Sequence, residues 1–283
     1  MINKLDPVVL ITEVALLMEY RNIILEKKDG VATLTLNRPD KLNALSQRLC
    51  QEVAHALADV ATDDATKVLV LTGNGRGFCS GADQTPSQGP NDELEPEGRN
   101  DLMEPFARFG KITTSLYGLG KPTIAAVNGV AVGAGFSYAM ACDIRIASEA
   151  ARFSCIFVRR ALVPDSGATF LLPLHVGLSK ALELMYTGDM IDAHEAERIR
   201  LVSKVVPHDQ LMEATYELAN RIASGPSVTI ELMKRVTRWS SEAILRQQII
   251  QETWAQGIVG QTQDRVEGAA AFREKREPHF QGR

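Results

Sequence analysis

Cysteine and histidine are scarce in this chain of 283 residues, which contains four of the former and five of the latter. The cysteines form no C-x-x-C pair, and no histidine falls in an H-E-x-x-H pattern. These absences argue against a zinc enzyme and against a disulfide framework. We expect the cysteines to be small core residues in a reduced cytoplasm, and the sequence predicts neither a metal nor a separate cofactor.

A large excess of charge and a long apolar run are also missing. The net charge of −4 gives no reason to expect nucleic acid as a partner. No stretch reaches the length of a membrane span. The apolar run in residues 1–17 is short, contains Glu13 and lacks a small-residue cleavage site. We therefore expect an N-terminal extension over residues 1–19 or an early start codon, with Met18 as the alternative beginning.

The residues that are present predict one α/β protein with a sizeable core, since 45% are hydrophobic and 23% charged. Alternation and turn residues predict strands over residues 23–26, 31–37, 67–72, 123–127 and 143–147. Helices are expected from Ser46, over residues 101–117 and up to residue 141, with a loop over residues 85–98. Later helices are expected over residues 179–186, 193–199 and 209–223 and from residue 227 onward. This pattern predicts an α/β core over residues 20–200 and a helical C-terminal part over residues 201–283.

Two glycine-rich turns, GNGRGFCSG (residues 73–81) and GVAVGAG (residues 129–135), each follow a predicted strand. A phosphate cradle would have this position, but neither turn ends in GK[ST] or forms a complete G-x-G-x-x-G with a ribose-binding acid downstream. A serine nucleophile elbow is the second interpretation, because residues 135–139 read GFSYA. Its later partners would be Asp189 and His208, which lie too close together in sequence for the usual hydrolase order.

The third interpretation takes the two turns together as an oxyanion hole. Each turn can present a backbone N–H, and Gly135 stands at the start of a predicted helix whose dipole favours negative charge. Each such donor contributes roughly 3–4 kcal/mol to transition-state stabilisation in known enzymes. Close helix packing would explain some of these glycines, but not two similar turns at two strand ends.

Four segments in order carry a family resemblance: LNRPDKLNALS (residues 36–46), GRGFCSGAD (75–83), KPTIAAVNGVAVGAG (121–135) and ACDIRIAS (141–148). From about residue 20 to the C-terminus the chain resembles the crotonase, or enoyl-CoA hydratase/isomerase, superfamily. The resemblance implies an α/β fold, a crotonase-like spiral of repeated ββα units with a helical C-terminal trimerisation region. It also implies an acyl-CoA thioester as substrate, so that coenzyme A is part of the substrate and no other cofactor is needed.

The resemblance also assigns residues to the site. The thioester oxygen of this family sits between two backbone N–H groups, which correspond here to those of Ala82 and Ala134. The positions that would contact CoA are Arg38, Lys41, Asp83, Phe272 and Lys275. The last two lie in the tail AFREKREPHF, where the CoA of a neighbouring subunit is within reach.

The sequence departs from the hydratases of this family at their two catalytic glutamates, whose positions hold Ser137 and Phe157. Hydration normally uses one carboxylate to deprotonate water and one acid to protonate carbon, so its standard form is disabled. Asp165 remains, in VRRALVPDSGATFLLP (residues 158–173), near the turn where related isomerases place one acid. Residue chemistry alone would make Asp165 a helix cap, because residues 164–167 (PDSG) are a good helix start.

We therefore predict a single-acid enoyl-CoA isomerase with Asp165 as its catalytic residue, most similar to the ring-epoxide and enoyl-CoA isomerases of phenylacetate breakdown. Ser137 and Tyr138 are candidates for orienting substrate or a water, with core packing as the alternative. Two other functions stay open: an enoyl-CoA hydratase with a water held by Ser137, and a non-catalytic CoA-thioester binding protein. The expected assembly is a cytoplasmic homotrimer or dimer of trimers, with no nucleic-acid or membrane partner.

Overall fold

The computed structural model describes residues 18–83 and 108–283. The expected loop over residues 85–98, and the first part of the helix expected over residues 101–117, lie outside the described residues. So does almost all of the expected N-terminal extension.

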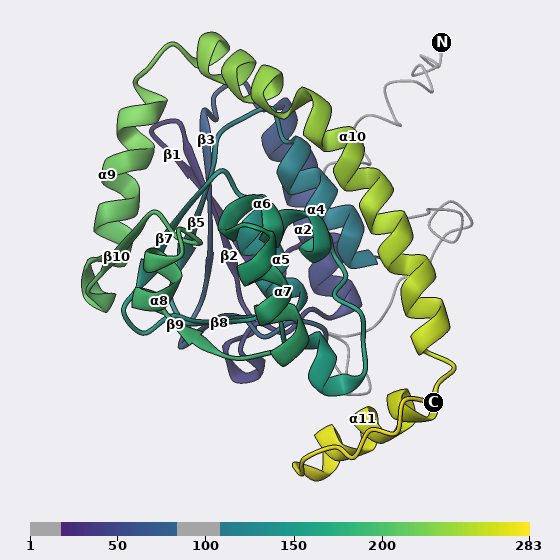
Figure 1. Ribbon diagram of the computed structural model, residues 1–283. Coiled ribbons are helices and arrows are strands. Elements are labelled where there is room, and N and C mark those ends of the chain that lie inside the picture. Colours follow the sequence, from purple (N-terminus) through teal and green to yellow (C-terminus); the bar gives the residue numbers. More distant parts are fainter. Residues whose placement is uncertain (1–17, 84–107) are drawn as a thin grey trace, which may run out of the picture.

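A six-stranded sheet forms the centre of the molecule, in the order β1-β2-β3-β5-β7-β10 (Figure 1). Its strands are β1 (Ile23–Lys28), β2 (Val31–Leu36), β3 (Val68–Gly73), β5 (Thr123–Val127), β7 (Ile144–Ser148) and β10 (Lys204–Val206). The hairpin of β1 and β2 is antiparallel, and its turn uses Asp29 and Gly30 with φ of 50° and 82°. The pairs from β2 to β10 are parallel. The strands expected from the sequence are thus confirmed to within one or two residues at their ends.

A second, four-stranded sheet was not expected from the sequence. It contains β4 (Gly77–Cys79), β6 (Val130–Val132), β8 (Arg152–Ser154) and β9 (Ile191–Asp192), in that order. Strands of two or three residues are too short to show a periodic pattern. The chain after β3, β5 and β7 continues into β4, β6 and β8 respectively, so each repeat supplies one strand to each sheet before a helix follows. This arrangement is the spiral of ββα units that the resemblance implies.

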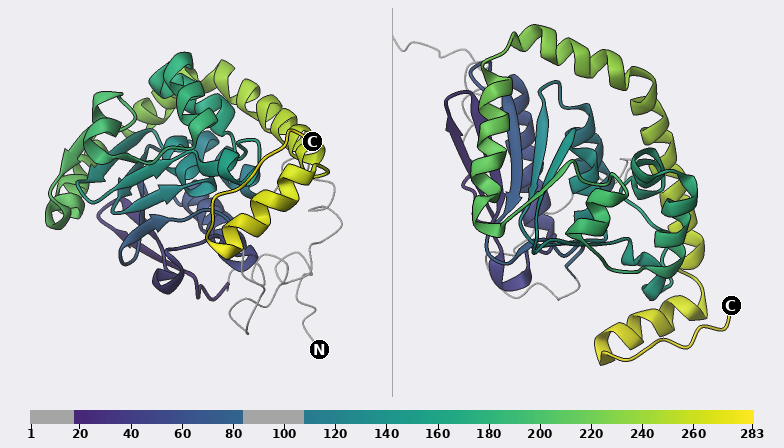
Figure 2. Two further views of the ribbon diagram at one scale, coloured as in Figure 1. Left: turned by 60° about the horizontal axis from the view of Figure 1, so that its bottom comes forward. Right: turned by 60° about the vertical axis from the view of Figure 1, so that its left-hand side comes forward.

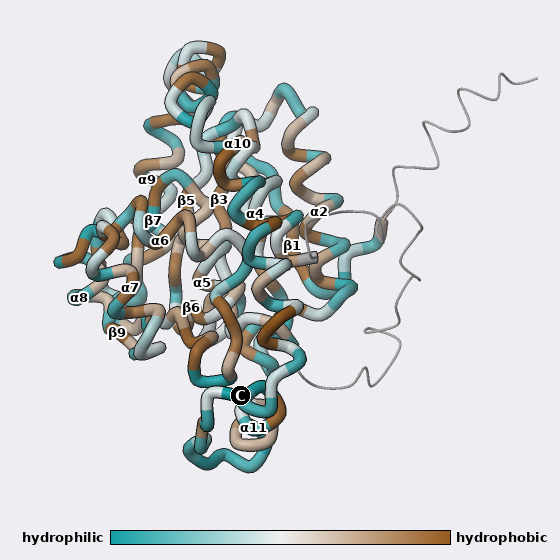
Figure 3. Tube along the Cα trace, turned by 45° about the vertical axis from the view of Figure 1, so that its right-hand side comes forward, coloured by the Kyte–Doolittle hydropathy of each residue, from teal (hydrophilic) through white to brown (hydrophobic). Residues whose placement is uncertain are grey.

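Helices cover both faces of the main sheet. The helices α2 (Gln47–Thr62), α4 (Arg108–Gly118) and α5 (Ala134–Ala141) pack in the larger hydrophobic cluster with the second sheet. Ser46 caps α2 as expected, since its hydroxyl accepts a hydrogen bond from the Leu49 backbone N–H at 3.2 Å. On the opposite face, α9 (Leu211–Ala223) covers a smaller cluster of residues from β3, β5 and β7. The central strands are apolar, whereas the chain after α11 is hydrophilic (Figure 3).

The C-terminal half adds five more helices and one strand to this core. Helices α6 (Ala168–Val176), α7 (Leu178–Thr187) and α8 (Ala193–Arg198) precede β10, and α10 (Ser227–Val259) and α11 (Gln263–Glu274) follow α9. Strand β10 pairs with β7, so the main sheet extends past the boundary expected at residue 200. The long helix expected from residue 227 is divided in two, because Thr262 caps a new helix by accepting the Arg265 N–H at 3.1 Å. Helix α10 arches over one end of the sheet and runs down its side, with α11 at the far end (Figure 2).

Candidate active site

The two glycine-rich turns lie against each other at the ends of β4 and β6, which pair in parallel. Gly81 and Gly133 both have positive φ, 83° and 57°. A Cβ on Gly81 would lie 2.9 Å from the Val132 carbonyl oxygen and 3.6 Å from the Ala134 nitrogen. Only glycine permits this conformation and this approach. The structure therefore brings together the two turns that carry Ala82 and Ala134.

Ala134 is the first residue of α5, and its backbone N–H has no acceptor within that helix. The N-terminal end of a helix carries partial positive charge, which favours an oxyanion. Gly135 fixes this end against β4, because a Cβ there would lie 2.3 Å from the Cys79 carbonyl oxygen. The geometry is compatible with the predicted oxyanion hole. The roles of Ala82 and Ala134 in it remain a prediction.

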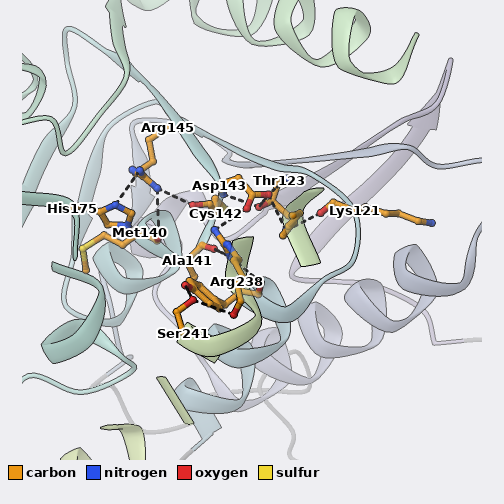
Figure 4. Close-up of polar contacts among 12 residues, drawn as sticks. Lys121, Thr123, Met140, Ala141, Cys142, Asp143, Arg145, His175, Arg238 and Ser241 are labelled. Atoms are coloured by element: carbon orange, nitrogen blue, oxygen red, sulfur yellow. Dashed lines mark hydrogen bonds and ion pairs between the residues drawn. The ribbon is translucent and has the colours of Figure 1, made fainter. Parts of the chain in front are cut away.

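The other end of α5 is held by Arg145, which is buried, and by Arg238 and His175, which are half-buried (Figure 4). Arg145 Nη1 donates to the Cys142 carbonyl at 2.8 Å, and Arg238 Nη1 donates to the Ala141 carbonyl at 3.2 Å. His175 Nε2 lies 3.0 Å from a third carbonyl, that of Met140. Cations at the C-terminal end of a helix interact favourably with the partial negative charge of the helix dipole there. Burial and the neighbouring Arg145 lower the pKa of His175 to about 3, so this imidazole stays neutral.

Asp143 ties the same end of α5 to the long C-terminal helix. Its carboxylate lies 2.8 Å from Lys234 Nζ and 2.7 Å from Arg238 Nη2, both on α10. It also accepts the Thr123 backbone N–H at 2.7 Å. These contacts explain the ACD segment as a structural anchor that fixes α5, and with it the turn at Ala134.

Asp165 lies beside the first turn of α5, since the Ser137 hydroxyl donates to the Asp165 backbone carbonyl at 3.3 Å. Its carboxylate accepts hydrogen bonds from the Ser166 hydroxyl at 2.7 Å and from Gln256 Nε2 at 3.2 Å. Burial raises the pKa of Asp165, while these two donors act in the opposite direction. A carboxyl with a raised pKa is better suited than an ordinary one to both accepting and returning a proton.

The helix-cap interpretation of Asp165 is wrong. The N-cap residue of α6 is Gly167, and no side chain of residues 164–167 caps the helix. The backbone N–H groups of Gly167 and Thr169, at the start of α6, instead donate to the Glu252 carboxylate at 2.8 and 2.9 Å. Glu252 comes from α10, and its burial raises its pKa to about 7. The Asp165 carboxyl is therefore not used to start α6.

The two positions that hold glutamates in the hydratases are buried here. Ser137 is 0% exposed and Phe157 6% exposed. The Tyr138 side chain is also buried, with its hydroxyl next to the thiol of Cys50, and burial raises its pKa well above the usual value. Tyr138 therefore stays protonated. The interpretation of Ser137 as a serine nucleophile gains no support, because its hydroxyl donates to the backbone carbonyl of Asp165.

A cavity of about 670 Å³ adjoins the two turns. It is lined by Ala82 and by four of the five residues expected to contact CoA, namely Lys41, Asp83, Phe272 and Lys275. The fifth, Arg38, is ion-paired with Asp83 at 2.8 Å. Phe272 and Lys275 thus line a cavity of their own chain. Their expected contact with the CoA of a neighbouring subunit remains a prediction. Ala134 and Asp165 are not among the lining residues.

The cavity lining is basic although the chain as a whole is acidic. Five basic side chains line it against two acidic ones: Lys41, Arg159, Arg160, Lys275 and Arg276 against Asp83 and Glu277. The Arg160 guanidinium stacks on the Phe272 ring at 3.7 Å, which joins α11 to the segment before Asp165. Sequence reasoning missed Arg159 and Arg160, and it missed Glu252 and Gln256 because no local motif marks them.

Known proteins resemble this chain in sequence and in fold. The family model described as "Enoyl-CoA hydratase/isomerase" matches residues 26–283. The chain belongs to this family, the crotonase superfamily of acyl-CoA enzymes.

Its relatives carry different names within that family. It is 36% identical to the 1,2-epoxyphenylacetyl-CoA isomerase of Escherichia coli, over 94% of this chain and 100% of the relative. It is 38% identical to the crotonyl-CoA hydratase of Syntrophomonas wolfei, over 93% and 99% respectively. A solved enoyl-CoA hydratase/isomerase from Pseudoalteromonas atlantica has a TM-score of 0.82 with 30% identity, over 92% of this chain and 100% of that chain.

Proposed function

We propose that this enzyme is an enoyl-CoA isomerase that moves a carbon–carbon double bond with a single carboxyl group, that of Asp165. The observation that carries the proposal is the contrast between the acid positions. Asp165 has a half-buried carboxyl whose pKa is raised by desolvation and which has no capping role. Ser137 and Phe157, at the positions of the two hydratase glutamates, have no acid to offer.

The proposed reaction begins with removal of a proton from the α carbon of a β,γ-unsaturated thioester by the Asp165 carboxylate. The electron pair left on carbon delocalises onto the thioester oxygen, which accepts hydrogen bonds from the N–H groups of Ala82 and Ala134. The protonated Asp165 then returns the same proton to the γ carbon, and the double bond now joins the α and β carbons. One carboxyl suffices because its basic and acidic steps follow each other.

The basic cavity supports CoA as the group that carries the acyl chain. Phosphate groups are strong hydrogen-bond acceptors with negative charge, and Lys41, Arg160 and Lys275 offer donors of the opposite sign. The Phe272 ring offers an apolar face in the same cavity. The Escherichia coli relative takes its name from a ring-epoxide CoA thioester, so a ring substrate is one candidate beside a linear enoyl chain.

Hydration is the second candidate, favoured by the name of the Syntrophomonas wolfei relative. In that reaction Asp165 would act with a water held by Ser137. The Ser137 hydroxyl is 0% exposed and already donates to the Asp165 carbonyl, which leaves it only acceptor capacity toward a water. This contact favours the isomerase.

Incubation of the pure protein with trans-3-enoyl-CoA and, separately, with crotonyl-CoA separates the candidates. We expect the first to be converted to trans-2-enoyl-CoA without hydroxyacyl product. Hydroxyacyl-CoA from crotonyl-CoA at a comparable rate would instead establish a hydratase. Binding of both thioesters without turnover would support the third possibility, a CoA-thioester binding protein.

We also propose that the protein is a cytoplasmic trimer or dimer of trimers. Helix α10 exposes an unusual number of large apolar side chains, among them Val228, Leu232, Met233, Val236, Trp239 and Trp254.

The four cysteines are unpaired and buried, which suits a reducing compartment. Across residues 18–83 and 108–283, no helix is both long and apolar enough to cross a bilayer.

The assembly prediction is checked by light scattering coupled to gel filtration. We expect a mass three or six times that of the 30.9 kDa chain. Replacement of Val236 and Trp239 with serine and glutamine should lower that mass, because it removes apolar area from the exposed face of α10. A monomer at micromolar concentration would contradict the prediction.

A further inference from the structure

Helix α10 contacts the segment around Asp165 through two side chains one helical turn apart, Glu252 and Gln256. This segment is conformationally demanding, because Ser166 and Gly167 both have left-handed backbone, with φ of 58° and 81°. A left-handed conformation is unfavourable for serine, so contacts from elsewhere must maintain it. Glu252 and Gln256 supply such contacts from 83 to 93 residues away in the chain.

Gln256 acts on the carboxylate itself. Its amide nitrogen donates to the Val163 carbonyl at 2.7 Å and to Asp165 Oδ2 at 3.2 Å. Both partners are acceptors, so the amide NH2 must face them. The amide oxygen is buried and has no hydrogen-bond partner among the described residues. The side chain is thus oriented to donate to an ionised Asp165.

Glu252 acts on the backbone that carries Asp165. It accepts the N–H groups of Gly167 and Thr169, and the Thr169 hydroxyl at 2.5 Å. Gln248, one turn earlier on α10, donates to the same Thr169 hydroxyl at 3.0 Å. The start of α6 is therefore fixed largely by side chains of α10, in addition to the Ala168 N–H that donates to the Asp165 carbonyl at 3.0 Å.

We propose that Gln256 is a positioning residue that orients the Asp165 carboxylate and favours its ionised form, while Glu252 holds the turn on which Asp165 stands. The inference rests on the proposed function in that it takes Asp165 to be the base. Helix α10 would then have two roles. Its Gln256 and Glu252 side chains position the proposed catalytic carboxyl, and its exposed apolar side chains are available for subunit contacts.

Within residues 18–83 and 108–283, few other titratable groups face Asp165. Glu252 on α10, Tyr138 on α5 and Cys155 in the segment before η2 (Ile156–Arg160) are its electrostatic neighbours. Burial raises the pKa of Cys155 to about 12, and that of Tyr138 well above its usual value, so both stay neutral at physiological pH. Glu252 is the remaining neighbour that titrates, with a pKa of about 7. Loss of the Gln256 donor should therefore raise the pKa of Asp165, because burial then acts with less opposition.

The test compares the variants Gln256→Met and Gln256→Glu with Gln251→Met, an exposed glutamine on the same helix. The activity of a catalytic base is lost below its pKa. In Gln256→Met we expect the acidic limb of kcat/KM to move to higher pH by about one unit. Gln256→Glu should move it further, because a second carboxylate then faces Asp165. KM at high pH should stay unchanged, and Gln251→Met should match the wild type.

A second measurement separates this inference from the proposed function. The Asp165 carboxyl carbon can be titrated directly by NMR in the wild type and in each variant, without any turnover. An upward shift in Gln256→Met supports the positioning role even if no substrate is isomerised, in which case only the proposed function fails. Folded variants whose Asp165 carboxyl titrates as in the wild type would overturn the inference, whatever their activity.

Discussion

Replacement of Asp165 with asparagine should reduce the isomerisation rate by about a thousandfold, in the middle of the range for loss of a general acid–base group. Asparagine has nearly the same volume but cannot take up the proton from the α carbon. The affinity for a CoA thioester should remain close to that of the wild type, because Lys41, Phe272 and Lys275 in the cavity are unchanged. Steady-state kinetics with trans-3-enoyl-CoA and calorimetric titration with a saturated acyl-CoA measure the two quantities.

The matched control for this change is Asp209→Asn, at an exposed acid before α9. It should leave the rate unaffected. Thermal unfolding of Asp165→Asn should show a folded protein, since the capping of α6 depends on Glu252 and not on Asp165. If the variant turned over substrate at the wild-type rate, Asp165 would have only a structural role.

Replacement of Ala134 with proline should lower kcat by about 100- to 1,000-fold, the loss that follows removal of one oxyanion-hole donor. Ala134 is the first residue of α5, where proline is well tolerated because its nitrogen needs no partner within the helix. The substitution therefore removes the N–H while the helix keeps its start. The rate is measured with the same substrate, and far-UV circular dichroism and thermal unfolding check the fold.

Ala134→Gly is the control for Ala134→Pro, because it changes the side chain and keeps the N–H. We expect it to retain most of the activity. A large loss in Ala134→Gly together with an active Ala134→Pro would place the oxyanion donor elsewhere.

The parts of this fold that the sequence predicts are those whose residues interact locally or with regular spacing. The alternating residues of β1 and β2, the Asp29–Gly30 turn and the Ser46 cap were readable because each pattern spans only a few residues. The strands β4, β6 and β8 have three residues each, too few for a periodicity, so the second sheet was missed.

In the candidate active site, too, the sequence predicted local features but not contacts between distant segments. The glycines at positions 81 and 133 mark turns that need left-handed or unusual backbone, which let the sequence indicate that the two turns act together. The assignment of Ala82 and Ala134 within those turns came from the family resemblance. Glu252 gives no such signal, because the Gly167 N–H to which it bonds lies 85 residues away in the sequence. Without any sign of Glu252 in the local sequence, Asp165 was the residue best suited to cap that helix. The cap is supplied by tertiary contact, which propensity alone does not predict.

The central claim, that one carboxyl moves a proton between two carbons, is tested most directly with a trans-3-enoyl-CoA carrying deuterium on its α carbon. The products of the wild type and of Asp165→Asn are analysed by mass spectrometry and NMR. We expect the wild type to give trans-2-enoyl-CoA with deuterium transferred to the γ carbon, and Asp165→Asn to form this product about a thousandfold more slowly. Conversion by Asp165→Asn at the wild-type rate, or a wild-type product with water added at the β carbon, would contradict it.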